Sequence, residues 1–256
     1  HKHVSAALNE ALAAVNGALG PFGLKEKDDG QADAAYKLSP NAGLGKTCAN
    51  VTAALGLPES LTFRADGIPR NWLAINDPEQ PMVMYLTEFL RQFVRAESSF
   101  LFGYTLEWIR PGQVVLAAAD EAQRLDLVGA ILQTAGLIET ADGAGAELAE
   151  KIAESVDEDQ RNTWAESLAE LQGKTAAEVL ERHVAGIETT ARRVGLLMAG
   201  DLLSAMRAWG RITESYDNPQ GKGVEDLDEI ITANPELKDM VAFAASDAFG
   251  KLLSDG

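Results

Sequence analysis

The sequence predicts an α+β fold that is mostly α-helical, with one small antiparallel sheet of about three strands between residues 60 and 86. Two observations lead to this prediction. Over most of the 256 residues, apolar side chains recur every three or four positions, which is the period of an amphipathic helix. The segments 60–65, 71–76 and 81–86 instead read as short strands, because turn residues such as Asp-Gly and Asp-Pro separate them.

The first expected helix covers residues 4–19 and carries one apolar stripe. That stripe consists of Val4, Leu8, Leu12, Val15 and Leu19. The polar stretch after it has almost no large apolar residues, which is typical of a linker or exposed loop. The chain is therefore expected to divide into an N-terminal amphipathic helix (1–20), a linker or exposed loop (21–38) and a single mostly helical domain containing the small sheet (39–256).

Several signals set the expected helix boundaries in the second half of the chain. Thr175 and Glu178 have the spacing of a capping box, and the helix that they begin is expected to continue to Trp209. Asn234 followed by Pro235 is typical of a helix start. The apolar pattern after Pro235 predicts one last helix over residues 235–253.

Charge and composition exclude several classes of function. A net charge of −17 would repel phosphate backbones and anionic lipid headgroups, so we expect neither nucleic-acid binding nor membrane insertion. No apolar run approaches the roughly 20 residues that a membrane-spanning helix needs. A single cysteine, Cys48, cannot form an internal disulfide, which favours a reducing compartment and predicts a cytoplasmic protein. The start without Met suggests a fragment of a longer chain.

The tripeptide Gly45-Lys46-Thr47 raises the question of nucleotide binding. A P-loop needs G-x-x-x-x-G-K-[ST], because its backbone amides surround the phosphates. Its first glycine would fall at residue 40, where the sequence has Pro40, which has no amide proton. The preceding residues 34–38 are also too polar for a buried strand. We therefore expect a helix start with a solvated lysine, and nucleotide binding through these residues stays as an alternative.

Residues 55–105 combine three expected strands with a following helix, and the helix begins with Ala96-Glu97-Ser98-Ser99-Phe100. This segment resembles the core of minigluzincin-type zinc metallopeptidases, in which an HExxH motif occupies that helix. The resemblance implies a degenerate zincin-like core. Glu97 matches the motif glutamate, whereas Ala96 and Phe100 stand where the two histidines belong.

Those two replacements remove the expected chemistry. Zinc in such a site takes two imidazoles one helical turn apart, and the glutamate acts on metal-bound water. Ala96 and Phe100 cannot bind a metal, and the histidines elsewhere are His1, His3 and His183. We expect a pseudoenzyme with no catalytic residue, no metal site and no cofactor. A metal-dependent hydrolase with an unrecognised site is the alternative.

Four further segments provide a wider resemblance that covers residues 40–256. They are GLGKTCANVTAALGLPE, ESSFLFGYTLEWIRPG, HVAGIETTARRVGLLMAGDLLSAMRAW and ELKDMVAFAASDAFGKL. Together they resemble the C-terminal region of large, uncharacterised bacterial tetratricopeptide-repeat proteins. The resemblance implies a noncatalytic protein-interaction or scaffold module with a protein partner, and it makes Gly45-Lys46 the start of a structural helix.

Two features near residue 195 concern packing. Arg192 and Arg193 are expected to form a buried ion pair with Asp201 or Glu188. Gly195, Ala199 and Gly200 instead suggest a place where another backbone approaches closely, because glycine has no Cβ and alanine has only a methyl group.

Overall fold

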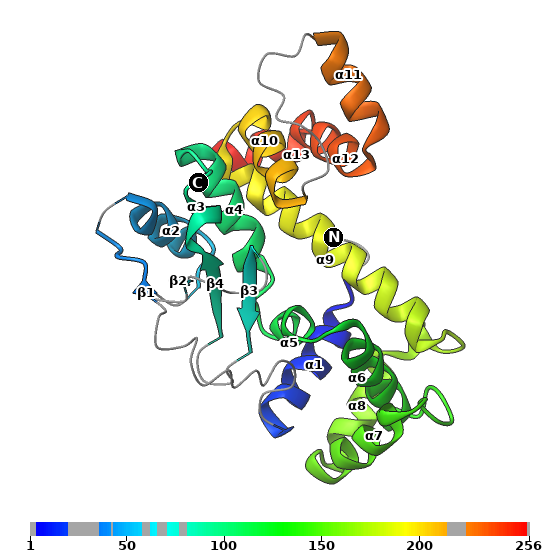
Figure 1. Cartoon of the computed structure of the whole chain (residues 1–256). Helices are drawn as coiled ribbons and strands as arrows, with labels where there is room; N and C mark the ends of the chain where they lie inside the picture. Colours follow the sequence, from blue (N-terminus) through cyan, green and yellow to red (C-terminus); the bar gives the residue numbers. More distant parts are fainter. Residues whose placement is uncertain are drawn as a thin grey trace. The chain divides into compact units, whose positions relative to one another are not determined.

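The computed structural model of the chain describes residues 4–19, 36–41, 43–57, 62–65, 71–76, 81–213 and 224–254. Helices dominate these residues, and four short strands form one small sheet (Figure 1). The mostly helical α+β class that the sequence predicts is confirmed.

The strands, in chain order, are β1 (Tyr36–Lys37), β2 (Thr62–Ala65), β3 (Trp72–Ile75) and β4 (Met82–Leu86). The helices of the first half are α1 (Ala6–Leu19), α2 (Gly43–Ala54), α3 (Thr87–Leu90), α4 (Arg95–Glu107), α5 (Gln113–Ala118) and α6 (Glu121–Thr134). The later helices are α7 (Ala144–Ser155), α8 (Glu158–Ser167), the short 3-10 helix η2 (Ala169–Leu171), α9 (Ala176–Ala199), α10 (Leu202–Thr213), α11 (Val224–Ala233), α12 (Pro235–Ala244) and α13 (Asp247–Ser254).

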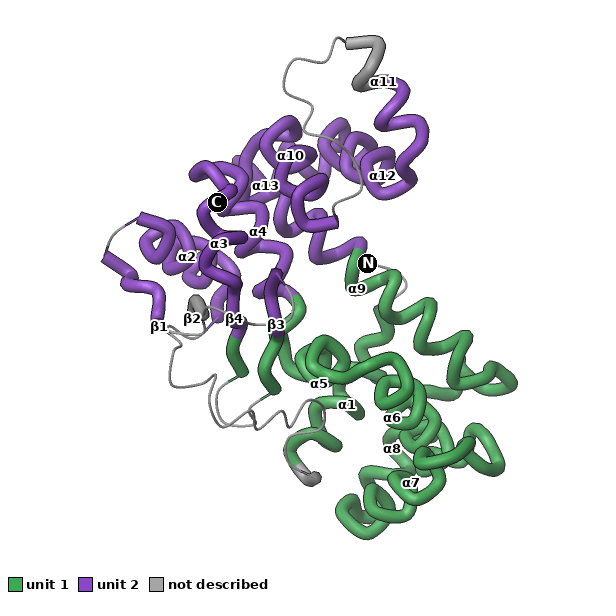
Figure 2. Tube along the Cα trace, in the orientation of Figure 1, with its two compact units in different colours: residues 1–29, 74–82, 108–188 green, residues 30–73, 83–107, 189–256 purple. Residues whose placement is uncertain are grey.

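The chain divides into two compact units (Figure 2). Unit 1 comprises residues 1–29, 74–82 and 108–188, and unit 2 comprises residues 30–73, 83–107 and 189–256. These limits differ from the expected ones, because the N-terminal helix shares a unit with residues 108–188 and because residues 39–256 contribute to both units. Within the expected linker (21–38), Tyr36 and Lys37 form β1, and residues 21–35 lie outside the described part of the chain.

Unit 1 is a packed set of helices. Helices α6 and α7 pack against each other, and α1 contacts α5, α7 and α8. The expected apolar stripe of α1 is buried at Leu8, Leu12 and Val15. Gly112 lies against the backbone of α1, since a Cβ there would be 2.1 Å from the Asn9 carbonyl oxygen. This close approach fixes the start of α5 beside α1.

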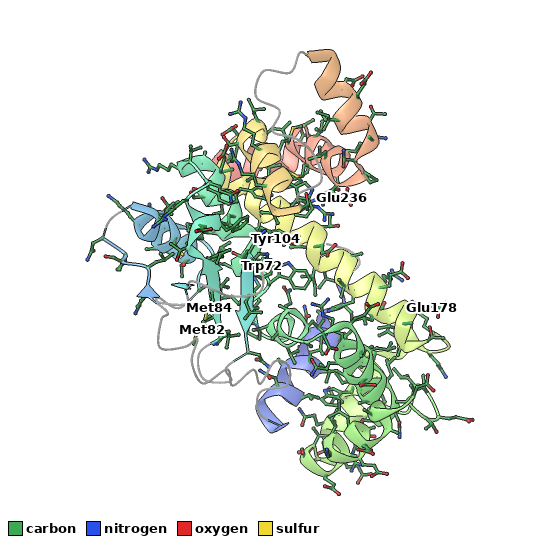
Figure 3. All side chains as sticks on the ribbon, in the orientation of Figure 1. Trp72, Met82, Met84, Tyr104, Glu178 and Glu236 are labelled. Carbon is green, nitrogen blue, oxygen red and sulfur yellow. The ribbon has the colours of Figure 1, made fainter. Side chains whose placement is uncertain are left out.

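Unit 2 is built around α4, which packs against α2 and α10. Aromatic rings fill much of its core. The rings of Trp72 and Tyr104 meet edge to face with centroids 6.1 Å apart (Figure 3), and Tyr104 meets Trp209 of α10 at 5.4 Å. Close contact between α4 and α9 depends on glycine, because a Cβ on Gly103 would lie 3.0 Å from the Gly195 Cα. The expected close approach is thus confirmed at Gly195 but is wrong at Gly200, where a Cβ would meet nothing within 4 Å.

The sheet has the strand order β1-β2-β4-β3. Antiparallel pairing is found between β1 and β2, although β1 was not among the expected strands. Two of the expected strands, β2 and β4, run parallel to each other and not antiparallel. The three expected strands are present, and β1 adds a fourth. The burial of β4 accounts for its place inside the sheet: Val83, Met84 and Tyr85 are buried in succession. A strand covered on both faces belongs between two neighbours, so β4 separates β2 from β3.

Two long helices expected from the sequence are interrupted. The helix beginning after Thr175 ends at Ala199, because Gly200 adopts a left-handed conformation (φ +74°). Asp201 then caps α10 by accepting from the Ser204 amide at 2.8 Å. The expected helix 235–253 is also divided, into α12 and α13. In both places the apolar period continues across the break, which explains why the periodicity did not reveal it.

Candidate functional site

The first turn of α4 holds Glu97, the residue that matches the glutamate of the metallopeptidase motif. Glu97 is 1% exposed. Its Oε2 accepts a hydrogen bond from the Val94 amide at 3.1 Å. The first amides of a helix have no partner within the helix and favour a negative charge nearby. The carboxylate therefore caps the start of α4.

A second element contributes the counter-ion of Glu97. Arg211 of α10 forms an ion pair with the same Oε2. Its guanidinium also lies over the ring of Phe93, 5.7 Å from the centroid. The Arg211 side chain is 22% exposed and that of Glu97 is 2% exposed, so the pair is largely withdrawn from water. With this oxygen engaged by an amide and a guanidinium, Glu97 is held as a structural anion.

The two positions that match the metal-binding histidines are part of the packing. Ala96 is half-buried, and Phe100 is fully buried. The Phe100 ring stacks on Tyr104 with centroids 6.4 Å apart and an angle of 4°. Gly195 of α9 lies so close to Phe100 that a Cβ there would be 2.9 Å from its ring and from its carbonyl oxygen. The space beside the second motif position is filled by α9.

The histidine of α9 also serves the packing of unit 1. His183 is 2% exposed; its Nδ1 accepts from the Ser5 amide at 3.3 Å, and its Nε2 lies 3.0 Å from the Asn9 side-chain oxygen. Since Nδ1 is an acceptor, Nε2 carries the proton and donates to Asn9. Burial lowers the pKa of His183 to about 4. His1 and His3 lie outside the described residues. In the part of the chain that is described, no three His, Cys, Asp or Glu side chains are arranged to hold a metal ion.

Gly45-Lys46-Thr47 lies within the first turns of α2. The strand before it, β1, is two residues long and sits at the edge of the sheet, antiparallel to its neighbour. A P-loop follows a strand of a parallel sheet, so this geometry differs from it. Lys46 is exposed and Thr47 is buried. The three residues nevertheless border open space, because Gly45, Lys46 and Thr47 line pockets at the start of α2.

The apolar run 113–118 and the acidic pair Asp120-Glu121 after it also have structural roles. The run forms α5, and Asp120 caps α6 by accepting from the Gln123 amide at 2.9 Å.

Arg193 forms its ion pair with Asp239 of α12 at 2.5 Å, in place of the expected Asp201 or Glu188. Sequence reasoning missed both Arg211 and Asp239, because nothing local to either residue indicates its partner. The amphipathic pattern of α10 shows only that this helix packs on something.

Comparison of the chain with protein-family models, with curated proteins and with solved structures gives no match. None of the described helices combines the length and apolar character that crossing a bilayer requires.

Proposed function

We propose that this chain is a noncatalytic protein-interaction module built on a peptidase-like core, and that it forms the C-terminal part of a larger tetratricopeptide-repeat protein. The observation that carries the proposal is the state of Glu97. An active site of the resembled class needs this carboxylate free to take a proton from metal-bound water. Here its Oε2 is buried beneath α10, paired with Arg211 and bonded to the Val94 amide.

The packing around Glu97 supports the same proposal. A catalytic zinc site keeps one position open for water. The Phe100 ring instead packs against Gly195 and Tyr104. A core that fills these positions has no room for the metal. The function of such a fold depends on the surface residues that contact a partner.

A protein partner fits the apolar residues that unit 2 exposes. Leu203, Leu252 and Leu253 are 42%, 53% and 46% exposed. Helix α13 is amphipathic in sequence, yet none of its side chains is buried. We place the interaction in the cytoplasm, because the single cysteine, Cys48, is buried and has no second cysteine with which to form an internal disulfide.

The proposal is tested on the purified chain by elemental analysis and by a peptidase assay with and without a chelator. We expect no stoichiometric zinc and no chelator-sensitive hydrolysis. Glu97→Gln is the matched variant: it should change stability and leave the hydrolysis baseline unaltered. Stoichiometric zinc together with hydrolysis that the chelator abolishes would refute the proposal and favour the metal-dependent hydrolase. A thermal shift with ATP and magnesium would favour the nucleotide alternative.

A further inference from the structure

Charge is distributed unevenly along this acidic chain. Residues 108–188, which form most of unit 1, contain 16 acidic and 6 basic side chains. Residues 34–58, which form β1 and α2, contain two lysines and no acidic residue. The segment 34–58 is therefore cationic in a chain whose net charge is −17.

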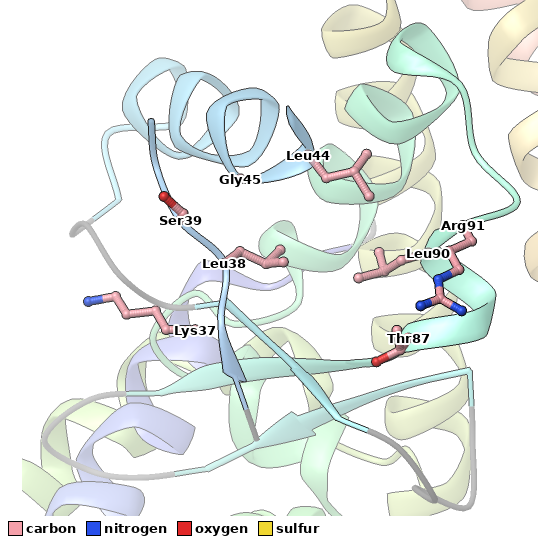
Figure 4. A pocket seen from close by; sticks show the side chains of 8 residues that line it. All are labelled: Lys37, Leu38, Ser39, Leu44, Gly45, Thr87, Leu90 and Arg91. Atoms are coloured by element: carbon pink, nitrogen blue, oxygen red, sulfur yellow. The ribbon is translucent and has the colours of Figure 1, made fainter. Parts of the chain in front are cut away.

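A pocket of about 310 Å³ lies between β1, the start of α2 and α3 (Figure 4). Lys37 stands at its β1 end and Arg91 at its α3 end, with leucines between them. The leucines are Leu38, Leu44 and Leu90. The wall between β1 and α2 requires glycine, because a Cβ on Gly45 would lie 1.8 Å from the Ser39 carbonyl oxygen.

A second pocket, of about 400 Å³, adjoins the first, since Leu44 lines both. Its polar lining includes Lys46, Asn50 and Arg95. Thr47 also lines it, and no hydrogen bond of its hydroxyl to another described residue is found. This hydroxyl is not among the buried unpartnered polar atoms of the described residues, so it is open to a hydrogen-bonding group from outside.

The four cations are available to such a group. Lys37, Lys46, Arg91 and Arg95 are exposed, and the cationic group of none of them forms an ion pair or a hydrogen bond with another residue in the described part of the chain. Lys46 is also placed against the helix dipole, which disfavours a cation in the first turn. This arrangement suits an anion better than it suits the protein alone.

We propose that this surface, defined by Lys37, Lys46, Arg91 and Arg95 and called here the α2 cationic surface, binds an acidic segment of a partner protein. The proposal rests on the protein-interaction function and names the chemistry of the partner. One carboxylate of the segment pairs with Lys37 at one end of the first pocket, and a second pairs with Arg91 at the other end. Lys46 and Arg95 of the second pocket attract the acidic segment further. An apolar side chain between the two carboxylates contacts the leucines of the first pocket.

The division of the four cations between two adjoining pockets favours a peptide over a small anion. A single phosphate would engage one pocket and leave two cations and the leucines unused. Nucleic acid is disfavoured because four cations on a chain of charge −17 cannot offset the repulsion of a polyanion. A short acidic peptide is affected mainly by charges within the screening length of about 8 Å at physiological salt, which here are the cations.

The test uses fluorescein-labelled peptides in which two glutamates flank a central leucine and the neighbouring positions are random. Binding is followed by fluorescence anisotropy at low and at physiological salt. A second pool carries lysines in place of the glutamates. Two charge-reversed variants, Lys37→Glu with Arg91→Glu and Lys46→Glu with Arg95→Glu, separate the two pockets. The matched control is Lys151→Glu with Lys238→Glu, which makes the same change of charge at exposed lysines of α7 and α12.

We expect the acidic pool to bind and the basic pool not to bind. Each reversed pair should weaken binding by about tenfold or more, while the control pair changes it less than about threefold. Equal binding of the two pools, or equal effects of the reversed and control pairs, would overturn the proposal. It would also be overturned if inorganic phosphate or ATP with magnesium bound at the cations while the acidic pool did not.

The same samples separate this inference from the proposed function. After incubation, the peptides are analysed by mass spectrometry for cleavage. Cleavage that a chelator stops would refute the noncatalytic function, whatever the anisotropy shows. Intact peptides that fail to bind would refute only the acidic partner.

Discussion

The starts of α4 and α2 lie in the same unit, and the two helices pack against each other, yet their charged residues have opposite surroundings. At the start of α4, Glu97 is buried, favourably placed for the helix dipole and paired with Arg211. At the start of α2, Lys46 is exposed, unfavourably placed for the dipole and without an ion pair among the described residues. We call the start of α4 the closed start, because Glu97 is paired within the protein and stabilises the fold. We call the start of α2 the open start, because Lys46 remains available to a ligand.

From the sequence alone, Ala96, Glu97 and Phe100 resembled a catalytic motif, and Lys46 was expected to be a solvated lysine. In the structure the motif residues are part of the packing, whereas Lys46 lines a pocket. Residue type alone cannot separate these cases, because burial and partners decide whether a charge is used inside the protein or offered to its surroundings.

The largest effect is expected from breaking the closed start. Arg211→Met leaves the Glu97 carboxylate buried without its counter-ion, and the free energy of unfolding should fall by about 3–5 kcal/mol. Urea denaturation measures this loss. Adding Glu97→Gln should recover much of it, because a neutral amide needs no counter-ion.

The Arg193–Asp239 pair provides a control within unit 2. Its side chains are 31% and 27% exposed, so water already screens the charges. Asp239→Asn should therefore cost less than about 1 kcal/mol. If Arg211→Met cost no more than Asp239→Asn, Glu97 would not be a structural anion and the contrast between the two helix starts would be lost.

Phe100 tests whether the second motif position is part of the core. Phe100→Ala should lower the free energy of unfolding by about 3–5 kcal/mol, because the ring is fully buried against Gly195 and Tyr104. Thermal and urea denaturation both report the change.

Restoring the two histidines of the HExxH motif tests whether the same position can still bind zinc. Ala96→His with Phe100→His puts two imidazoles one turn apart beside Glu97, but it removes an aromatic ring from the core and inserts a polar group. We expect lower stability without zinc-dependent hydrolysis. Tight zinc binding with peptide cleavage by this variant would mean that an open cleft persists around Glu97.

Unit 1 also contains a charged-or-neutral group that is engaged within the protein. His183 is buried and hydrogen-bonded to Ser5 and Asn9. Its pKa is about 4 in the folded chain, against about 6.5 in an unfolded one. Between these values the unfolded chain binds a proton that the folded chain does not bind. Stability from this group is therefore complete above pH 6.5, and roughly 3 kcal/mol of it is lost as the pH falls to 4.

Urea denaturation of the wild type and of His183→Gln at several pH values isolates this contribution. We expect the variant to be less stable at neutral pH, and the difference between the two proteins should shrink as the pH falls from 6.5 to 4. A constant difference over that range would mean that His183 takes up its proton equally well in the folded chain.

The sequence predicted what depends on neighbouring residues. The stripe of α1 and the capping box at Thr175, where the Thr175 amide donates to Glu178 at 2.8 Å, follow from spacings of three and four. The parallel pairing of β2 with β4 and the Glu97–Arg211 ion pair did not follow, because they join segments far apart in the chain. The break at Gly200 had a local signal in Gly-Asp, which the continuing apolar period concealed.

The same limit applies to the candidate sites. Ala96, Glu97 and Phe100 were found by their order along one helix, but the contacts that close the space around them come from α9 and α10. The α2 cationic surface draws on β1, α2 and the segments around α3 and α4. A single sequence shows its four cations as separate residues.

The smallest effect on stability is expected at the open start. Lys46 makes no ion pair among the described residues and lies in the first turn of α2. Lys46→Ala should change the free energy of unfolding by a few tenths of a kcal/mol, as surface substitutions usually do. Lys46→Glu should raise it by about 0.3–1 kcal/mol, because an anion near a helix start is favourable. Urea denaturation at low salt gives both values.

The same substitutions should weaken acidic-peptide binding. The positive charge of Lys46 would then slightly destabilise the folded chain while it contributes to ligand binding. A clear loss of stability in Lys46→Glu would contradict this, because it would mean that the lysine already has a partner within the protein; a loss of ATP affinity in Lys46→Ala would show instead that nucleotide binding is the use of this charge.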